Sequence, residues 1–123
     1  MHERVNLADL ELHDVENADA RVKAVGYELR PQKMRPSVWV FEAGGTGPMH
    51  YQREQEELYH VLSGAFELAF ADDDGEETDA LALEPGDFVV VSADEVRQLR
   101  CVEDGEVFVV GAPSTKDDGV VVE

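Results

Sequence analysis

Residues 44–64 have the sequence GGTGPMHYQREQEELYHVLSG. Side chains two residues apart on a β-strand point to the same face of the sheet, so His50 and Gln52 share a face. After a short loop, Glu57 begins the next strand and can face them across the interior of the fold. The stretch therefore predicts that an imidazole, an amide oxygen and a carboxylate meet in one cavity.

The predicted cavity contains the side-chain types of a metal site. Imidazole, amide and carboxylate groups can together hold a divalent cation and leave open positions for water or substrate. By the same alternation Tyr59 shares the face of Glu57, whereas His60 points the other way. We therefore expect Tyr59, and not His60, to face the cavity.

The remainder of the chain predicts an all-β fold, because short apolar runs rich in Val and aromatic residues are separated by single Pro and Gly. Turns are predicted at Ser63-Gly64, at residues 72–75 and, as a type II turn, at residues 84–87. Strands about ten residues apart that are joined by such turns are typical of a sandwich or barrel. The predicted strands are residues 21–29, 38–42, 57–62, 66–70, 78–83, 88–92, 96–102 and 106–111.

The two ends of the chain carry weaker patterns. A short helix is expected near residues 7–12. Residues 114–123 are expected to form either a frayed tail or a strand that is added to a neighbouring subunit.

The stretch at residues 44–64 resembles the first motif of the cupin superfamily. That motif is Gly, five residues, His-x-His, three or four residues, Glu, six residues and Gly. Gly44, His50, Glu57 and Gly64 all stand at motif positions. Gln52 stands where the family usually has its second His.

The segment that begins at Pro85-Gly86-Asp87 resembles the second cupin motif, and the usual final His of that motif corresponds to Arg97. The resemblance implies a cupin (jelly-roll type) antiparallel β-barrel. It implies one domain over residues 1–123, with the barrel core at about residues 21–111 and the termini as flanking arms. It also implies a homodimer, because small cupins commonly pair their barrels.

The resemblance leaves two hypotheses for the pocket, because the usual cupin ligand set is three His and one Glu. In the first, His50, Gln52 and Glu57 weakly bind one divalent transition metal, such as Zn, Fe, Mn or Ni. In the second, the pocket is free of metal, because an arginine stays protonated and repels cations. Arg97 then pairs with Glu57 and receives a carboxylate or phosphate.

The strand that contains Arg97 supports an inward position for this residue. Arg97, Leu99 and Cys101 share one face of it, so the charge lies among apolar residues. Trp39 and Tyr59 are expected to supply aromatic walls for a bound molecule.

The composition excludes several classes of protein. The chain has 28 Asp and Glu against 10 Lys and Arg, a formal net charge of -18, which argues against nucleic-acid binding. We interpret this charge as adaptation to high salt, where screening weakens the self-repulsion. No apolar run is long enough for a membrane helix and no secretory signal is present, so a cytoplasmic location is expected.

The sequence therefore favours a protein that binds a small anionic or polar molecule. The first alternative is a metal-dependent cupin enzyme, a dioxygenase or an isomerase of a small polar metabolite. The second alternative is a structural or assembly role.

Overall fold

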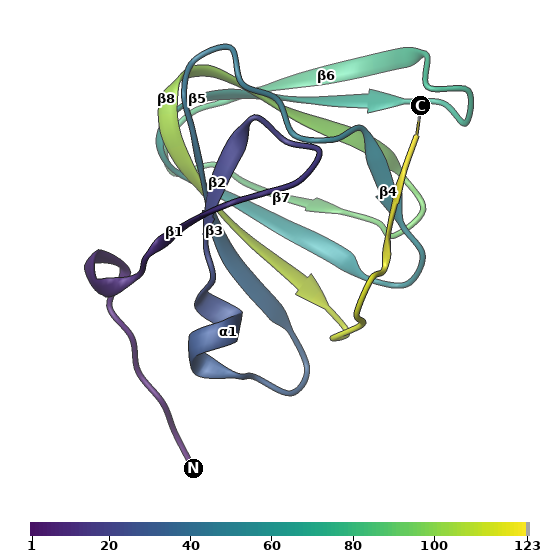
Figure 1. Ribbon diagram of the computed structural model, residues 1–123. Helices are drawn as coiled ribbons and strands as arrows, with labels where there is room; N and C mark the ends of the chain where they lie inside the picture. Colours follow the sequence, from purple (N-terminus) through teal and green to yellow (C-terminus); the bar gives the residue numbers. More distant parts are fainter. Residues whose placement is uncertain (123) are drawn as a thin grey trace.

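The structure is a computed structural model that describes residues 1–122. Its strands form one antiparallel sheet that curls around a core, as Figure 1 shows, and this confirms the predicted all-β fold. The strands are β1 (Leu12–Asp14), β2 (Ala20–Lys23), β3 (Arg35–Phe41), β4 (His50–Gln52), β5 (Glu56–Ala71), β6 (Glu77–Leu83), β7 (Phe88–Val91), β8 (Val96–Ala112) and β9 (Gly119–Val121). The short 3-10 helix η1 (Leu7–Asp9) precedes β1, and helix α1 (Val25–Leu29) follows β2.

The two long strands, β5 and β8, pair with each other along most of their length and bend together. The first part of β5 pairs with β7, and the last part pairs with β6. In the same way, the last part of β8 pairs with β3, and its first part contacts β4. The bend therefore divides the sheet into two layers that face each other, with the core between them.

The bend lies at a pair of glycines. The β5–β8 register shifts between Val61 and Phe66, and Gly64 has a φ of 80°. A Cβ on Gly64 would collide with the backbone of residues 103–105, and one on Gly105 would collide with residues 63 and 64. The hairpin predicted at Ser63-Gly64 is therefore wrong: this glycine forms a bulge that bends one continuous strand.

The other two predicted turns are confirmed. Asp72 closes the β5–β6 turn, because its carboxylate accepts the backbone N–H groups of Asp74 and Glu76. The β6–β7 turn has a φ of 98° at Gly86 and a hydrogen bond from the N–H of Asp87 to the carbonyl of Glu84. This is the geometry of a type II turn.

Several predicted elements differ from the structure. The strands predicted over residues 96–102 and 106–111 are one continuous strand, β8. The strand predicted over residues 21–29 ends at Lys23, and residues 25–29 form α1, because five residues of apolar and polar alternation also fit one helical turn. The helix expected near residues 7–12 is only η1. The C-terminal segment is neither frayed nor added to another subunit, because β9 pairs with β4 of the same chain. Residue 123 lies outside the described residues.

The core between the layers is apolar. It contains Phe41, Tyr59, Val61, Phe66, Leu68, Leu83, Val91, Leu99, Cys101, Val107 and Val109. Within residues 1–122, no helix has the length and apolar character needed to cross a membrane.

Candidate functional site

A cavity of about 100 Å³ opens between β3, β4, β5 and β8. Strand alternation places its wall residues, since Trp39 and Phe41 are two apart on β3, and Glu57 and Tyr59 are two apart on β5. Most of the lining is apolar, and its polar side-chain atoms belong to Trp39, His50, Glu57 and Tyr59. The complete lining is Trp39, Phe41, Gly47, Pro48, His50, Glu57, Tyr59, Leu99 and Val109.

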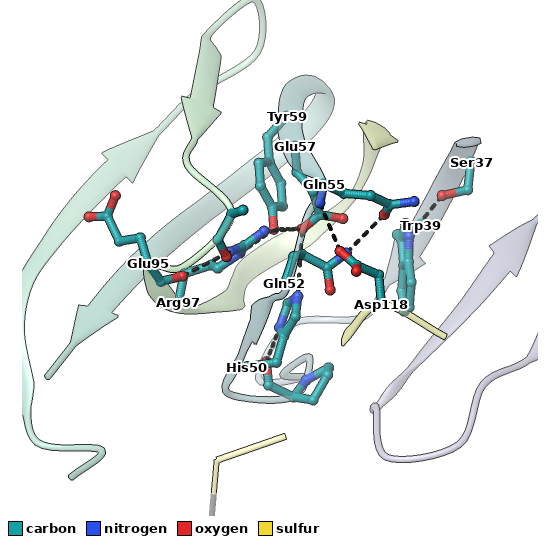
Figure 2. Close-up of polar contacts among 12 residues, drawn as sticks. Ser37, Trp39, His50, Gln52, Gln55, Glu57, Tyr59, Glu95, Arg97 and Asp118 are labelled. Atoms are coloured by element: carbon teal, nitrogen blue, oxygen red, sulfur yellow. Dashed lines mark hydrogen bonds and ion pairs between the residues drawn. The ribbon is translucent and has the colours of Figure 1, made fainter. Parts of the chain in front are cut away.

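The Glu57 carboxylate is the centre of the polar contacts in this cavity (Figure 2). Its Oε1 accepts hydrogen bonds from Nη2 of Arg97 at 2.6 Å and from the Tyr59 hydroxyl at 2.8 Å, and it lies 3.5 Å from Nε2 of His50. Burial acts to raise the pKa of Glu57, but the contacts with His50 and Arg97 outweigh it and lower the pKa from 4.5 to about 2. Glu57 is therefore ionised at neutral pH.

The second carboxylate oxygen, Oε2, has no hydrogen-bond partner among residues 1–122. Every fully buried side-chain nitrogen or oxygen in this part of the chain has a partner. It follows that Oε2 is accessible, and since Glu57 lines the cavity, this oxygen is available to a bound molecule.

His50 presents one defined nitrogen to the cavity. Its Nδ1 lies 3.1 Å from the carbonyl of Pro48. A carbonyl can only accept a hydrogen bond, so Nδ1 carries the proton in this contact. The Nε2 atom then faces Oε1 of Glu57, 3.5 Å away, and is the nitrogen placed for proton exchange with that carboxylate.

Arg97 lies behind Glu57 and does not line the cavity. Its inward position is as predicted, and the side chain is fully buried, with 0% exposure. The guanidinium donates to the backbone carbonyls of Ser92 at 3.3 Å, Ala93 at 3.2 Å and Glu95 at 2.8 Å. These bonds and those to Glu57 and Tyr59 leave no face for an anionic ligand, so in this structure Arg97 positions Glu57.

The same contacts affect two more pKa values. Burial, reinforced by the neighbouring Glu57 carboxylate, raises the pKa of Tyr59 well above its ordinary value. For Arg97, burial acts to lower the pKa, but Tyr59 and Glu57 outweigh it and raise the pKa. At neutral pH the buried cluster therefore contains a neutral phenol, a carboxylate and a guanidinium.

Gln52 is buried in a separate polar network and does not line the cavity. Its Nε2 donates to Oε1 of Gln55 at 3.0 Å, and the Gln55 amide donates to the carbonyl of Thr115 at 3.0 Å. The Asp118 carboxylate accepts the backbone N–H groups of Glu54 and Gln55 at 2.9 and 2.8 Å. This network joins the C-terminal segment to the β4–β5 loop, and no local sequence pattern indicated it.

Trp39 lines the cavity as predicted, and His60 lies outside it. The Trp39 indole N–H donates to the Ser37 hydroxyl at 3.0 Å, and its ring stacks beside Phe41 with centroids 6.3 Å apart. His60 stacks on Phe88, with ring centroids 3.8 Å apart. The other apolar walls, Phe41, Leu99 and Val109, were predicted only as strand residues.

The cavity residues fit a divalent metal poorly. Of the three predicted ligands the structure brings together only His50 and Glu57, because Gln52 turns to Gln55. The Arg97 cation contacts Oε1 of Glu57 and would repel a metal ion bound at Oε2 of the same carboxylate. Across residues 1–122 there is no group of three His, Cys, Asp or Glu side chains that could hold an ion.

Residues 37–111, more than half of the chain, match the family described as "Cupin domain". The chain belongs to the cupin family. No curated protein matches the sequence.

Solved cupin-fold structures show the same architecture at low identity. The polyketide cyclase RemF from Streptomyces resistomycificus is 19% identical with a TM-score of 0.80, and the match covers 100% of this chain and 87% of that one. KdgF from Halomonas sp. is 21% identical with a TM-score of 0.74, and the match covers 95% and 98%. Oxalate decarboxylase from Bacillus subtilis is 13% identical with a TM-score of 0.73, and this cupin covers 31% of its length. These similarities support the cupin fold. The function is therefore inferred from the residues of the cavity.

Proposed function

We propose that this cupin binds a small, uncharged polar molecule in the β3–β5–β8 cavity without a resident metal. The observation that carries the proposal is the ionised Glu57 carboxylate, which lines the cavity and whose Oε1 contacts Arg97, while Oε2 has no hydrogen-bond partner among residues 1–122. A hydroxyl or N–H group of the ligand would donate to Oε2. Its apolar part would pack against Trp39, Phe41 and Leu99.

The charge of this cavity selects against an anionic group at its inner end. Arg97 pairs with Oε1 of Glu57, so the group left for a ligand is the other carboxylate oxygen, which repels anions. Of the anionic or polar ligands expected from the sequence, the polar class therefore fits the inner cavity. A volume of about 100 Å³ holds only a few non-hydrogen atoms.

The test is a thermal-shift screen of purified protein against matched pairs of small molecules, such as benzamide and benzoate, with phenol as a further donor. We expect phenols and primary amides to raise the melting temperature and carboxylates of the same shape to have no effect. Glu57→Gln should abolish the response to the donors. A response to benzoate that equals the response to benzamide, or an undiminished response to the donors in Glu57→Gln, would reject the proposed binding mode.

The metal-free part of the proposal has its own measurement. Protein purified in KCl without a chelating tag should contain well under one transition-metal ion per chain by elemental mass spectrometry. A stoichiometric metal that is lost in His50→Ala would instead support the metal-dependent alternative.

A second candidate function, proton-transfer catalysis, is favoured by the His50–Glu57 pair. A His nitrogen 3.5 Å from a carboxylate, in a largely apolar cavity, has the composition of a general acid–base site. RemF is named a polyketide cyclase, and an isomerase or cyclase reaction on a carbonyl compound would use such a pair. Solvent deuterium incorporation into a bound cyclic ketone, present in the native protein and lost in His50→Ala, would support this function, and its absence from every bound ketone would exclude it.

A further inference from the structure

A second and larger hollow, of about 470 Å³, lies between α1, the α1–β3 connection and β3. Its lining is Val22, Ala24, Gly26, Tyr27, Pro31, Met34, Arg35, Pro36, Ser37, Trp39 and Ser114. Figure 1 shows α1 and the connection to β3 together at one end of the barrel. We refer to this hollow as the α1 groove.

The α1 groove and the inner cavity share one wall residue. Trp39 lines both, and no other residue does. Its indole is fixed in orientation by the hydrogen bond to Ser37, which also lines the groove. A molecule that occupies the groove therefore contacts one part of Trp39, and a group in the inner cavity contacts another.

The groove differs in charge from the rest of the chain. The chain has only 10 Lys and Arg. Three of them, Arg30, Lys33 and Arg35, lie in the six-residue stretch 30–35 that joins α1 to β3. Glu28 of α1 lines a different hollow with Asp9 and Glu11, and the Glu54 carboxylate accepts a hydrogen bond from the Thr115 hydroxyl at 3.1 Å. A protein of net charge -18 thus has a locally basic segment next to the groove, and Arg35 of this segment lines it.

Two arginines at the groove, Arg30 and Arg35, form no ion pair within residues 1–122 and are available to an anionic ligand. Arg35 lines the groove, and its Nη1 donates a hydrogen bond to the carbonyl of Thr115 at 3.1 Å. Arg30 lies over the ring of Tyr27, 5.1 Å from its centroid, and that ring lines the groove. Neither arginine has a carboxylate within 4.0 Å among the residues that the structure describes. A guanidinium without a carboxylate partner at the rim of an apolar groove is a receptor for a carboxylate, sulfonate or phosphate.

We propose that the α1 groove binds the anionic end and the apolar body of the ligand whose polar, uncharged end enters the inner cavity. The ligand class is an elongated amphipathic acid. Arg35 and Trp39 are four residues apart, about 13 Å along β3. The groove supplies the volume that the inner cavity lacks. This proposal rests on the proposed function for the inner end of the ligand, but the groove and its anion specificity are tested separately.

The probe for the groove is anilinonaphthalene sulfonate, which combines an apolar body with one anion and is too large for the inner cavity. Trp39 is the only tryptophan of the chain, so its fluorescence reports contact with the probe directly. We expect the sulfonate to quench Trp39 at saturation. Arg35→Gln should weaken its binding about tenfold, as the loss of one charge-assisted contact does.

Three controls separate the possible outcomes. The neutral analogue N-phenyl-naphthylamine lacks the anion, so Arg35→Gln should leave its affinity unchanged. Arg21→Gln removes an exposed arginine of β2 that does not line the groove and should leave sulfonate binding unchanged. Phe88→Ser removes an exposed apolar residue of β7, 65% exposed, where the probe would otherwise bind nonspecifically.

Equal sulfonate affinity in the native protein and Arg35→Gln, with an unchanged melting temperature, would overturn the groove proposal. Binding that leaves Trp39 fluorescence unchanged and disappears in Phe88→Ser would overturn it too. Glu57→Gln should retain sulfonate binding, because Glu57 lies outside the groove. Loss of phenol binding together with retained sulfonate binding in that variant supports both sites, whereas retained phenol binding there rejects only the proposed function of the inner cavity.

Discussion

Replacement of Glu57 by Gln should change the pH dependence of stability by a predictable amount. The folded-state pKa of Glu57 is lowered from 4.5 to about 2, and its side chain is only 13% exposed. The lowered pKa corresponds to about 3 kcal/mol of stability at neutral pH. Because the folded pKa lies below the unfolded one, this contribution is present above about pH 4.5 and is lost as the pH falls toward 2. Linkage gives a loss of about 2 kcal/mol by pH 3.

The assay is urea unfolding of the native protein and Glu57→Gln in KCl at pH 7, 5.5 and 3. All other carboxylates titrate in both proteins, so the difference between the two free energies of unfolding reports Glu57 together with its contacts to His50 and Arg97. That difference should be constant from pH 7 to 5.5 and should fall by about 2 kcal/mol at pH 3. A difference that stays constant down to pH 3 would refute the argument that Arg97 and His50 hold Glu57 ionised.

Four further predictions follow from the same structure. Arg97→Met should destabilise the fold by about 3–5 kcal/mol at pH 7, because it leaves Glu57 buried without its cation; a loss below 1 kcal/mol in urea unfolding would contradict this. Gly64→Ala should cost at least about 2 kcal/mol, because φ is positive and a Cβ meets the neighbouring strand; an unchanged unfolding midpoint would show that the bulge can relax. The melting temperature should rise between 0.1 and 1 M KCl, as the Debye length shortens from about 10 to about 3 Å; a flat response would argue against adaptation to high salt. The expected homodimer should appear in light scattering as twice the 13.6 kDa mass of the chain, and the mass of a single chain would reject it.

The sequence determined the fold class and the centre of the site. Alternation of apolar and polar residues is local information, and it correctly placed Glu57 and Tyr59 on one face and His60 on the other. The same alternation placed Arg97 inside the barrel. Local patterns failed at residues 25–29, where a single helical turn and a short strand have the same pattern, and at Ser63-Gly64, where a hairpin and a bulge use the same residues.

Only the tertiary structure decided what the inward side chains contact. Gln52 turns away from the cavity because Gln55 and the distant Asp118 form a network across more than 60 residues of sequence. Arg97 is enclosed by the carbonyls of the loop before β8, so it positions Glu57 and does not reach a ligand. The face of the sheet to which a side chain points follows from alternation along its own strand. The partners of a long polar side chain come from segments that are distant in the sequence, so only the tertiary structure shows them.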